Sequence, residues 1–478
     1  MPASNDLSPR MSRRMNPHIF RAYDVRGLVE DELTPAVAER IGAAFATDIR
    51  RRGGKALAVG RDSRPSSPAL YEAIIAGVRA AGIDVTVLGL TPSPVAGFAT
   101  AAWALDGAIN VTASHNPVRF NGLKLVRAGA AALLPEEIQD LRALAESGDF
   151  ERGRGALTER DPKPEYVAML ERRFPVARPL RVVADPGNGV ATLTGPAALR
   201  GAGCEVVGLY TELLEGFPNH LPDPQAAETM ADLGRTVIDH EADCGFAWDG
   251  DGDRVGLVDE SGRRHEADWI VALLARDLLH RHPGARVLLD GKCSLGAIRA
   301  IRARGGEPVL TRTGYTLLRR RMAAEGILFG GEASGHVIFG EDYYGIDDGV
   351  YAACAIARLV AAEDRPLSAR FQEMKAGMPP LFTSREIMMP CGDAAKFRVA
   401  AAVNARLRAA CDGLEAEGLR LDFGDGWALV RASNTNPVLS VRFEAESRDR
   451  YDAIRTLIWE AVGEHAEVTI PDGVEEPA

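Results

Sequence analysis

Short apolar runs rich in Val, Ile and Leu alternate along this chain with Ala-rich stretches whose apolar residues follow helical spacing. This alternation predicts strands and helices in turn, and it favours layered α/β domains. A first unit of this kind contains predicted helices over 35–51 and 67–81 and predicted strands over 56–60, 84–88 and 107–112.

The same alternation starts again twice. The second unit has predicted strands over 180–185, 204–208 and 244–248, and predicted helices over 193–201 and 226–240. The third has predicted helices over 268–280, 295–304 and 315–325, and predicted strands over 285–289 and 307–310. The units share the order of their elements but little sequence, so we do not interpret them as a sequence repeat.

The pattern changes after Pro379-Pro380. The remaining chain has predicted strands over 381–388, 419–423, 427–431 and 438–444, and predicted helices over 394–410 and 448–462. This segment is shorter and richer in strands, which is typical of a small α+β domain. The length of 478 residues is in keeping with three or four domains.

Composition and charge exclude several classes of protein. The net charge of −11 argues against a nucleic-acid-binding protein, which usually presents a basic face. The apolar stretches are too short and too often interrupted by charge to predict a membrane span. The six cysteines are far apart and form no CxxC pair, which indicates reduced thiols. Residues 1–17 lack the apolar core of a secretory signal. We therefore expect a cytoplasmic protein with neither nucleic-acid nor membrane partners. A monomer or weak homodimer is a separate expectation, which these features do not decide.

The first candidate site is the segment Thr112-Ala113-Ser114-His115-Asn116-Pro117. It follows a predicted strand and ends at a proline, so we expect an exposed loop. A lone Ser-His pair is usually structural, but Asn121 and Lys124 follow closely with an amide and a cation. A phosphoryl group on Ser114 would need such neighbours, because it adds about −1.5 to −2 charge.

The second candidate is Asp249-Gly250-Asp251-Gly252-Asp253-Arg254, directly after a predicted strand. Carboxylates at alternate positions can converge on one side of the backbone, and oxygen ligands suit a hard cation such as Mg²⁺ or Ca²⁺. The segment nearly matches an EF-hand loop. However, Arg254 stands where that loop needs glycine, and apolar residues follow at once.

Two further loops could bind a sugar phosphate. Gly330-Gly331-Glu332-Ala333-Ser334-Gly335-His336 presents a carboxylate and a hydroxyl that suit sugar hydroxyls. Arg431-Ala432-Ser433-Asn434-Thr435-Asn436-Pro437 offers a guanidinium, hydroxyls and amides that suit a phosphate. Either could alone be an ordinary polar turn. Minor candidates are Tyr23, Arg26 and Lys292, together with the segments 60–64 and 185–189.

Taken in order, these four loops resemble the α-D-phosphohexomutase superfamily, and in particular its phosphomannomutase/phosphoglucomutase branch. The resemblance extends from Phe20 to Glu444. It implies three similar mixed α/β-layer domains and a smaller C-terminal α+β domain, heart-shaped around a central cleft. The expected ranges are 1–159 for a phosphoserine domain, 160–262 for metal binding, 263–377 for sugar binding and 378–478 for phosphate binding.

The resemblance also implies the roles of individual residues. Ser114 would be the phosphoserine that gives and takes back one phosphoryl group, with a hexose 1,6-bisphosphate as intermediate and activator. Mg²⁺ would be held by Asp249, Asp251, Asp253 and an oxygen of Ser114. The other catalytic residues would be His115, Lys124 and Arg254. The substrate-binding residues would be Tyr23, Arg26, Lys292, Tyr315, Glu332, Ser334, His336, Arg431, Ser433, Asn434 and Thr435.

Two positions depart from the family pattern. Tyr315 follows Thr313-Gly314 where the family often has His, and Tyr carries no positive charge near neutral pH. Ala333 stands where phosphoglucosamine mutases tend to have Gln, so we expect mannose and glucose phosphates as substrates. The alternatives are a phosphoglucosamine mutase, a Mg²⁺-dependent sugar phosphatase with an aspartate nucleophile, and a non-catalytic sugar-phosphate-binding protein. The general base is left open among His115, Lys124 and His336.

Overall fold

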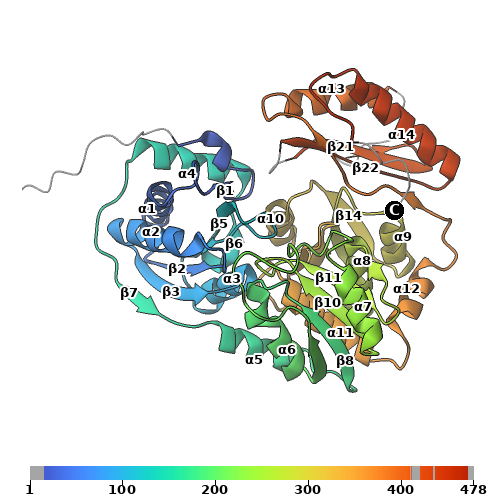
Figure 1. Ribbon diagram of the computed structural model, residues 1–478, viewed down its shortest axis with the longest axis horizontal. Helices are drawn as coiled ribbons and strands as arrows, with labels where there is room; N and C mark the ends of the chain where they lie inside the picture. The colour runs from blue at the N-terminus through green and yellow to red at the C-terminus, as the bar shows by residue number, and fades with distance from the viewer. Residues whose placement is uncertain (1–14, 410, 412–419, 434–436, 472–478) are drawn as a thin grey trace, which may run out of the picture.

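The computed structural model describes residues 15–409, 411, 420–433 and 437–471. Within these residues the chain forms four sheets, three of them in α/β domains and one in the C-terminal domain. Figure 1 shows the N-terminal domain on one side, the second and third domains packed together, and the C-terminal domain above them. An ion pair between Arg21 and Asp393 at 3.9 Å joins the N-terminal and C-terminal domains. This arrangement confirms the predicted fold class. Below, the domains are called N-terminal, second, third and C-terminal.

The N-terminal domain contains a mixed sheet in the order β1-β5-β4-β2-β3-β7, with β6 paired to β5. Its strands are β1 (Val25–Leu28), β2 (Ala56–Arg61), β3 (Asp84–Leu90), β4 (Gly107–Val111), β5 (Phe120–Arg127), β6 (Ala131–Ala132) and β7 (Leu157–Glu159). Its helices are η1 (Pro17–Ile19), α1 (Pro35–Arg51), α2 (Ser67–Ala80), α3 (Ser93–Ala102), η2 (Ala128–Ala130) and α4 (Pro135–Ser147). Strands β4 and β5 are antiparallel, which places Lys124 opposite Asn110 and close to the loop that follows β4.

The second domain has a sheet in the order β12-β11-β10-β8-β9. Its strands are β8 (Leu180–Asp185), β9 (Cys204–Gly208), β10 (Cys244–Trp248), β11 (Val255–Asp259) and β12 (Arg264–His265). Its helices are α5 (Lys163–Arg173), η3 (Val190–Leu193), α6 (Gly195–Gly201) and α7 (Ala231–Asp239). Because β10 and β11 pair antiparallel, Asp249–Arg254 forms the connection between them.

The third domain has a sheet in the order β14-β13-β15-β16-β17. Its strands are β13 (Arg286–Asp290), β14 (Glu307–Thr311), β15 (Phe329–Gly331), β16 (Val337–Phe339) and β17 (Ile346–Asp347). Its helices are α8 (Ala267–Arg281), α9 (Leu295–Ala303), α10 (Tyr315–Glu325), α11 (Gly349–Ala361) and α12 (Leu367–Lys375). The segment from Glu332 to His336 connects the antiparallel strands β15 and β16.

The C-terminal domain has a sheet in the order β18-β22-β21-β20, with β19 paired to β22. Its strands are β18 (Phe382–Thr383), β19 (Ile387–Pro390), β20 (Leu421–Asp422), β21 (Gly426–Ala432) and β22 (Val438–Ala445). Its helices are α13 (Lys396–Arg408) and α14 (Arg448–Gly463). Figure 1 shows both helices on the face of this sheet that is turned away from the other domains.

Two predicted elements differ from the structure for local reasons. The helix predicted over 226–240 begins only at Ala231, since the Thr229 hydroxyl hydrogen-bonds the carbonyls of Asp223 and Ala226 in the preceding turn. The strand predicted over 381–388 is divided into β18 and β19. The Ser384 side chain accepts a hydrogen bond from Phe443 N at 2.9 Å, which replaces a regular ladder contact.

The hydrophobic cores show how the domains are joined. The second and third domains share one core, which includes Trp248 of β10 and Tyr351 of α11. Phe98 of α3 extends the same core into the N-terminal domain. The C-terminal domain has a separate core around Val441 and Ile458. None of the described helices is long and apolar enough to cross a membrane. The six cysteines are free, as predicted.

Candidate active site

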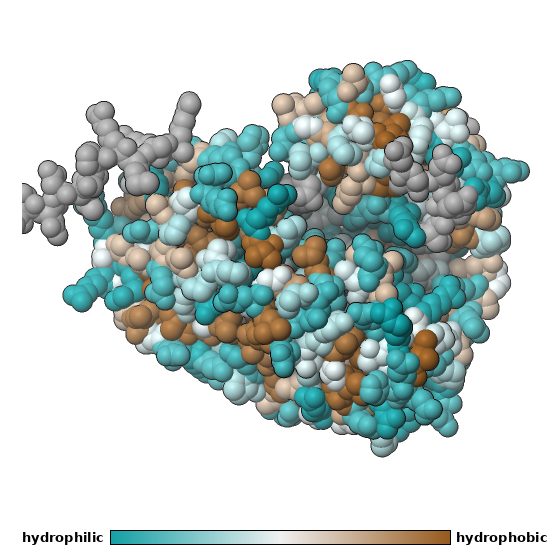
Figure 2. All heavy atoms as spheres, viewed as in Figure 1, coloured by the Kyte–Doolittle hydropathy of each residue, from teal (hydrophilic) through white to brown (hydrophobic). Residues whose placement is uncertain are grey.

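A cleft of about 930 Å³ lies among the four domains. Figure 2 shows the surface hollowed between the N-terminal and C-terminal domains. All the described residues predicted for catalysis or substrate binding line this cleft: Tyr23, Arg26, Ser114, His115, Lys124, Arg254, Lys292, Tyr315, Glu332, Ser334, His336, Arg431 and Ser433. Asn434 and Thr435 lie outside the described residues.

Ser114 follows β4 and has a left-handed backbone with a φ of 52°. Its hydroxyl donates a hydrogen bond to Asp249, and His115 Nδ1 lies 3.0 Å from the same oxygen. Burial, with the nearby Arg254 and Arg26, holds the pKa of His115 well below its usual value. The prediction of an exposed loop holds only in part. Pro117 is exposed and His115 and Asn116 are half-buried, but Ser114 is only 2% exposed, because residues of its own domain and of the second domain enclose it.

The three aspartates between β10 and β11 converge beside Ser114. Asp249, Asp251 and Asp253 are buried, and each presents an oxygen within 4.8 Å of the others. One oxygen each of Asp251 and Asp253 is buried without a hydrogen-bond partner among the described residues. Burial raises the pKa of Asp249 well above its usual range, and the charges of Asp253 and Asp251 raise it further. So dense a group of acids favours a bound cation.

Lys124 of β5 supplies positive charge to this acidic group from the N-terminal domain. Its ammonium lies 2.7 Å from Asp251 and also contacts Asp253. Burial opposes the lysine charge, but Asp251 and Asp253 outweigh burial and raise the Lys124 pKa well above its usual value. Ser93 of α3, in the same domain, donates a hydrogen bond from its hydroxyl to Asp251. The carboxylates of one domain are thus held by donors of another.

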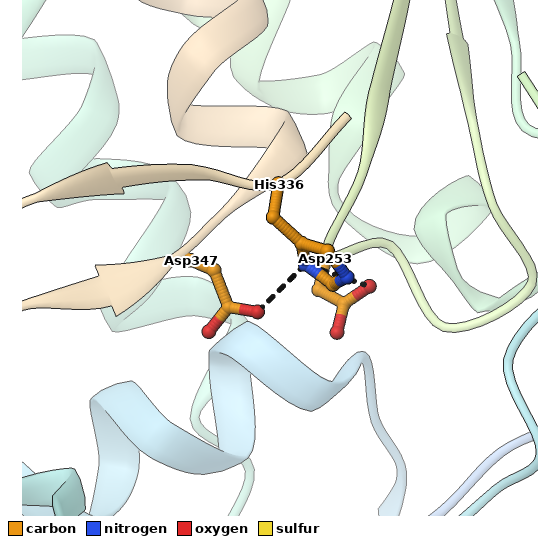
Figure 3. A group of neighbouring side chains, drawn as sticks. All are labelled: Asp253, His336 and Asp347. Carbon is orange, nitrogen blue, oxygen red and sulfur yellow. Dashed lines mark ion pairs between the residues drawn. The ribbon is translucent and has the colours of Figure 1, made fainter. Parts of the chain in front are cut away.

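His336 connects the acidic loop to the third domain. Its Nδ1 lies 2.8 Å from Asp347 and 3.7 Å from Asp253, and Figure 3 shows the ring pointing toward both. Its Nε2 accepts a hydrogen bond from Arg254 Nε at 3.1 Å. Asp253, His336 and Asp347 could also hold a metal. However, Arg254 already occupies one nitrogen of His336, and Arg319 pairs with Asp347 at 3.2 Å. The all-carboxylate group is therefore the better site for a hard cation.

The loop between β15 and β16 orients Glu332 toward the cleft. The two oxygens of its carboxylate accept hydrogen bonds from Gly314 N at 2.6 Å and from the Ser334 hydroxyl at 2.9 Å. Asp290 holds the base of the loop by accepting from Ala333 N at 3.0 Å. Val255 N donates to Gly335 O at 3.2 Å, which ties this loop to the acidic loop.

Lys292, Arg431 and Glu386 meet where the third and C-terminal domains face the cleft. Lys292 pairs with Glu386 at 2.9 Å, and the Arg431 guanidinium lies 3.9 Å from the same carboxylate. Burial acts to raise the Glu386 pKa, but Lys292 and Arg431 outweigh it and lower the pKa to about 2. This cluster places two cations on the third and C-terminal domains, whereas Ser114 lies on the N-terminal domain.

Tyr315 lies between two of the predicted site residues. Its ring stacks on His336 with centroids 5.0 Å apart, and the Lys124 ammonium lies 5.6 Å from its centroid. Burial raises the pKa of Tyr315, so its hydroxyl keeps its proton at neutral pH. Tyr23 packs edge-on against this ring and donates to Thr313 O at 2.6 Å.

Sequence reasoning missed several residues of this region. Glu386, Asp290, Asp347 and Arg442 were not proposed, although Glu386 and Arg442 line the cleft and Asp290 and Asp347 are buried behind it. Only Asp290 carried a signal, because it lies two positions before Lys292. Arg64 belonged to a segment named as a minor candidate, and its guanidinium donates a hydrogen bond to the main-chain carbonyl of Ser114 at 2.6 Å.

Four family models together match most of the chain. They describe the three α/β/α domains of phosphoglucomutase/phosphomannomutase, at residues 17–152, 164–262 and 266–376, and its C-terminal domain, at residues 386–461. The order of these matches is the order of the domains in the structure.

Known proteins agree with this assignment. A phosphomannomutase/phosphoglucomutase of Pseudomonas aeruginosa is 38% identical over 92% of this chain and 94% of its own length. A phosphoglucomutase of Neisseria gonorrhoeae is 35% identical over 91% of this chain and 95% of its own. The crystal structure of a phosphoglucomutase/phosphomannomutase family protein from Burkholderia thailandensis superimposes with a TM-score of 0.85 at 35% identity, covering 97% of this chain and 100% of that one. The chain therefore belongs to the phosphoglucomutase/phosphomannomutase family of the α-D-phosphohexomutase superfamily.

Proposed function

We propose that this protein is a Mg²⁺-dependent mutase that moves a phosphoryl group between C1 and C6 of mannose and glucose phosphates. One observation carries the proposal. Within a single cleft, a serine beside three convergent carboxylates lies on one side and a cationic cluster containing Arg431 lies on another. A mutase needs both, because one phosphate reacts while the other must be held.

The proposed reaction has two mirrored transfers. The bond from phosphorus to Ser114 Oγ breaks, and a bond from phosphorus to the oxygen of the free sugar hydroxyl forms. That hydroxyl gives its proton to a base beside Ser114, and the departing Ser114 Oγ takes up a proton, which it gives back in the second transfer. The hexose 1,6-bisphosphate then turns end for end, and its other phosphate returns to Ser114. His115, whose Nδ1 lies 3.0 Å from Ser114 Oγ, is the candidate base in contact with this oxygen. Lys124 was the other candidate near Ser114 in the sequence, but its raised pKa keeps the ammonium protonated, so it cannot accept a proton. His336 is placed differently, with its two nitrogens facing Arg254 and Asp347.

The other residues position and neutralise the reactants. Phosphoryl transfer depends mainly on alignment and on stabilising the charge of the transferred group. Lys124, Arg254 and Arg26 supply that charge near Ser114. Lys292, Arg431 and Ser433, together with the predicted Asn434 and Thr435, hold the phosphate that does not react. Glu332 and Ser334 hydrogen-bond sugar hydroxyls, and Tyr23 and Tyr315 line the path of the sugar.

The cluster formed by the three aspartates fits Mg²⁺. Its ligands are buried oxygens, and the unpaired oxygens of Asp251 and Asp253 are free to coordinate. Asp249, Asp251 and Asp253 would hold the ion together with an oxygen of Ser114. The bound ion would withdraw charge from the phosphoryl group during transfer.

The substrate is proposed from Ala333 and from the relatives. Ala333 is a small buried residue, and its side chain offers no hydrogen-bond acceptor to an amino group at C2 of the sugar. The relatives compared above are named for mannose and glucose phosphates. The competing hypotheses are a mutase that acts on glucosamine phosphate and a sugar phosphatase that forms an aspartyl phosphate. Sugar phosphates are the proposed partners, and a cytoplasmic monomer or weak homodimer is still a prediction.

The sugar preference predicts a ranking of substrates. Mannose 1-phosphate and glucose 1-phosphate should each give a kcat/KM at least about 10-fold above that of glucosamine 1-phosphate, a difference of about 1.4 kcal/mol. Coupled assays with hexose 1,6-bisphosphate as activator measure all three values. A larger kcat/KM for glucosamine 1-phosphate would assign the enzyme to that sugar instead.

Ser114→Ala should lower kcat by at least about 1,000-fold, because no other group replaces the phosphoryl carrier. Binding of glucose 6-phosphate by calorimetry should change less than about threefold, since the remaining phosphate contacts stay in place. Ser147→Ala, at the exposed end of α4, is the matched control and should behave as wild type. Intact-mass analysis after treatment with glucose 1,6-bisphosphate should find one added phosphoryl group on wild type and none on Ser114→Ala. A phosphoryl group on an aspartate would instead support the phosphatase.

Replacement of single carboxylates should identify which of the two candidate clusters holds the metal. Saturating Mg²⁺ should raise the Tm of wild type by several degrees, because an ion at about 100 times its Kd stabilises by about 2.7 kcal/mol. Asp251→Asn should lose this Mg²⁺-dependent rise. Asp347→Asn should keep it, even if its own Tm is lower. The reverse pattern would place the ion at Asp253, His336 and Asp347.

Glu386→Gln should change how stability depends on pH. The folded pKa of Glu386 is about 2 against about 4.5 unfolded, so its ionised form stabilises the fold above pH 4.5 and this stabilisation is lost as the pH falls toward 2. Between pH 7 and pH 4 the loss is about 1 kcal/mol for wild type and absent for Glu386→Gln. Urea unfolding of both proteins at the two pH values measures this difference. Parallel pH dependence in the two proteins would contradict the strong pairing with Lys292.

A further inference from the structure

Arg64 lies in the connection between β2 and α2, beneath the loop that carries Ser114. The residue is completely buried, with 0% exposure, and it does not line the cleft. A buried guanidinium persists only where its donors are satisfied and its charge is balanced. Its neighbours therefore show what it does.

The five N–H donors of Arg64 match five acceptors. Nε donates to Asp62 at 3.1 Å. Nη1 donates to the carbonyls of Pro117 at 3.0 Å and Phe120 at 3.2 Å. Nη2 donates to the carbonyls of Ser114 and Asn116, both at 2.6 Å. Four of the five acceptors are thus main-chain carbonyls of one loop, residues 114–120.

The charge partner of Arg64 is itself fixed. Asp62 accepts hydrogen bonds from Arg64 N at 3.0 Å and from the Ser67 hydroxyl at 2.5 Å. Asn121 donates to the same hydroxyl at 3.0 Å. The guanidinium is therefore oriented by a buried network that reaches both ends of the Ser114 loop.

The Ser114 carbonyl is confined from two sides. Arg64 Nη2 binds it on one side, and a Cβ added at Gly250 would come within 2.3 Å of it on the other. The φ of Ser114 also lies in the left-handed region. Residues other than glycine adopt this backbone conformation only when the surrounding structure imposes it. The direction of Ser114 Oγ follows from this backbone, since no long side chain separates the two.

We propose that Arg64 is a positioning residue that sets the phosphoryl-transfer geometry of Ser114 through the main chain of residues 114–120. The proposal rests on the proposed role of Ser114. Transfer rates fall steeply when reacting atoms are misplaced by about 1 Å. Lysine cannot substitute, because its single ammonium cannot present five donors in a planar fork.

The test separates positioning from binding and from folding. Wild type, Arg64→Lys and Arg64→Ala are mixed with glucose 1,6-bisphosphate, and the rate at which Ser114 gains a phosphoryl group is followed by intact mass. Arg79→Ala is the matched control: this arginine of α2 donates to the main-chain carbonyl of Gly155 at 3.0 Å and does not line the cleft. Calorimetry with glucose 6-phosphate and the Tm of each variant complete the measurement.

We expect the transfer rate to fall at least 100-fold in both Arg64 variants, while the Kd for glucose 6-phosphate changes less than threefold and Arg79→Ala is unaffected. Added guanidinium ion should restore transfer in Arg64→Ala at least 10-fold, and ammonium should not. A merely structural arginine would lower the Tm and leave the transfer rate of the folded protein unchanged.

A second variant covers the case in which Arg64 substitutions do not fold. Gly250→Ala presses on the same carbonyl from the opposite side and should also slow transfer, with Mg²⁺ affinity measured in parallel. Normal transfer in folded Arg64→Lys, or in Gly250→Ala, would overturn the proposal. If wild type itself never gains a phosphoryl group on Ser114, it is the proposed function that fails, which is a different result.

Discussion

The concentration of negative charge at Asp249, Asp251 and Asp253 is the constraint around which this molecule is organised. Three acids with oxygens within 4.8 Å of one another, all buried, repel strongly unless cations and donors surround them. The second domain, which carries them, does not supply all of these. Lys124 and Ser93 come from the N-terminal domain, and His336 comes from the third. The acidic loop is therefore stable only where three domains meet, and this meeting point forms one wall of the cleft.

A second wall of the cleft, formed by Lys292, Arg431 and Glu386, balances its charges in a different way. Arg431 and Lys292 approach each other from two domains, and Glu386 offsets their charge from within the cleft. If a substrate phosphate binds there, as proposed, it competes with a carboxylate that is already ionised, so one anion replaces another. This lowers the cost of desolvating the arginine and lysine during binding.

Much of the fold was predictable because its signals are local. Strands Cys204–Gly208 and Cys244–Trp248 and helix Tyr315–Glu325 were predicted to the residue, since each has clear apolar spacing and flanking turns. Helices α3 and α11 were not predicted. Both are buried on almost every side, so they lack the polar face that marks an amphipathic helix.

The candidate site divides in the same way. Ser114 and the three aspartates stand in short motifs whose chemistry is visible in sequence. Glu386 and Arg442 stand in ordinary strand-like segments, and they acquire their meaning only from residues that other domains bring to them. The burial of Ser114 could not be predicted from the sequence either. It involves Arg64, 50 residues before Ser114, and Gly250, more than a hundred residues after it.

The separate core of the C-terminal domain has a consequence for how the chain folds. The second and third domains share one core, which also takes in Phe98 of the N-terminal domain, whereas Val441 and Ile458 belong to an independent core. Cooperativity follows shared packing. The second and third domains should therefore unfold together. The N-terminal domain, most of whose buried residues form a core of their own, and the C-terminal domain should each behave as a further unit. During synthesis the larger body can be complete before the C-terminal domain leaves the ribosome, so the cleft acquires the wall that carries Arg431 last.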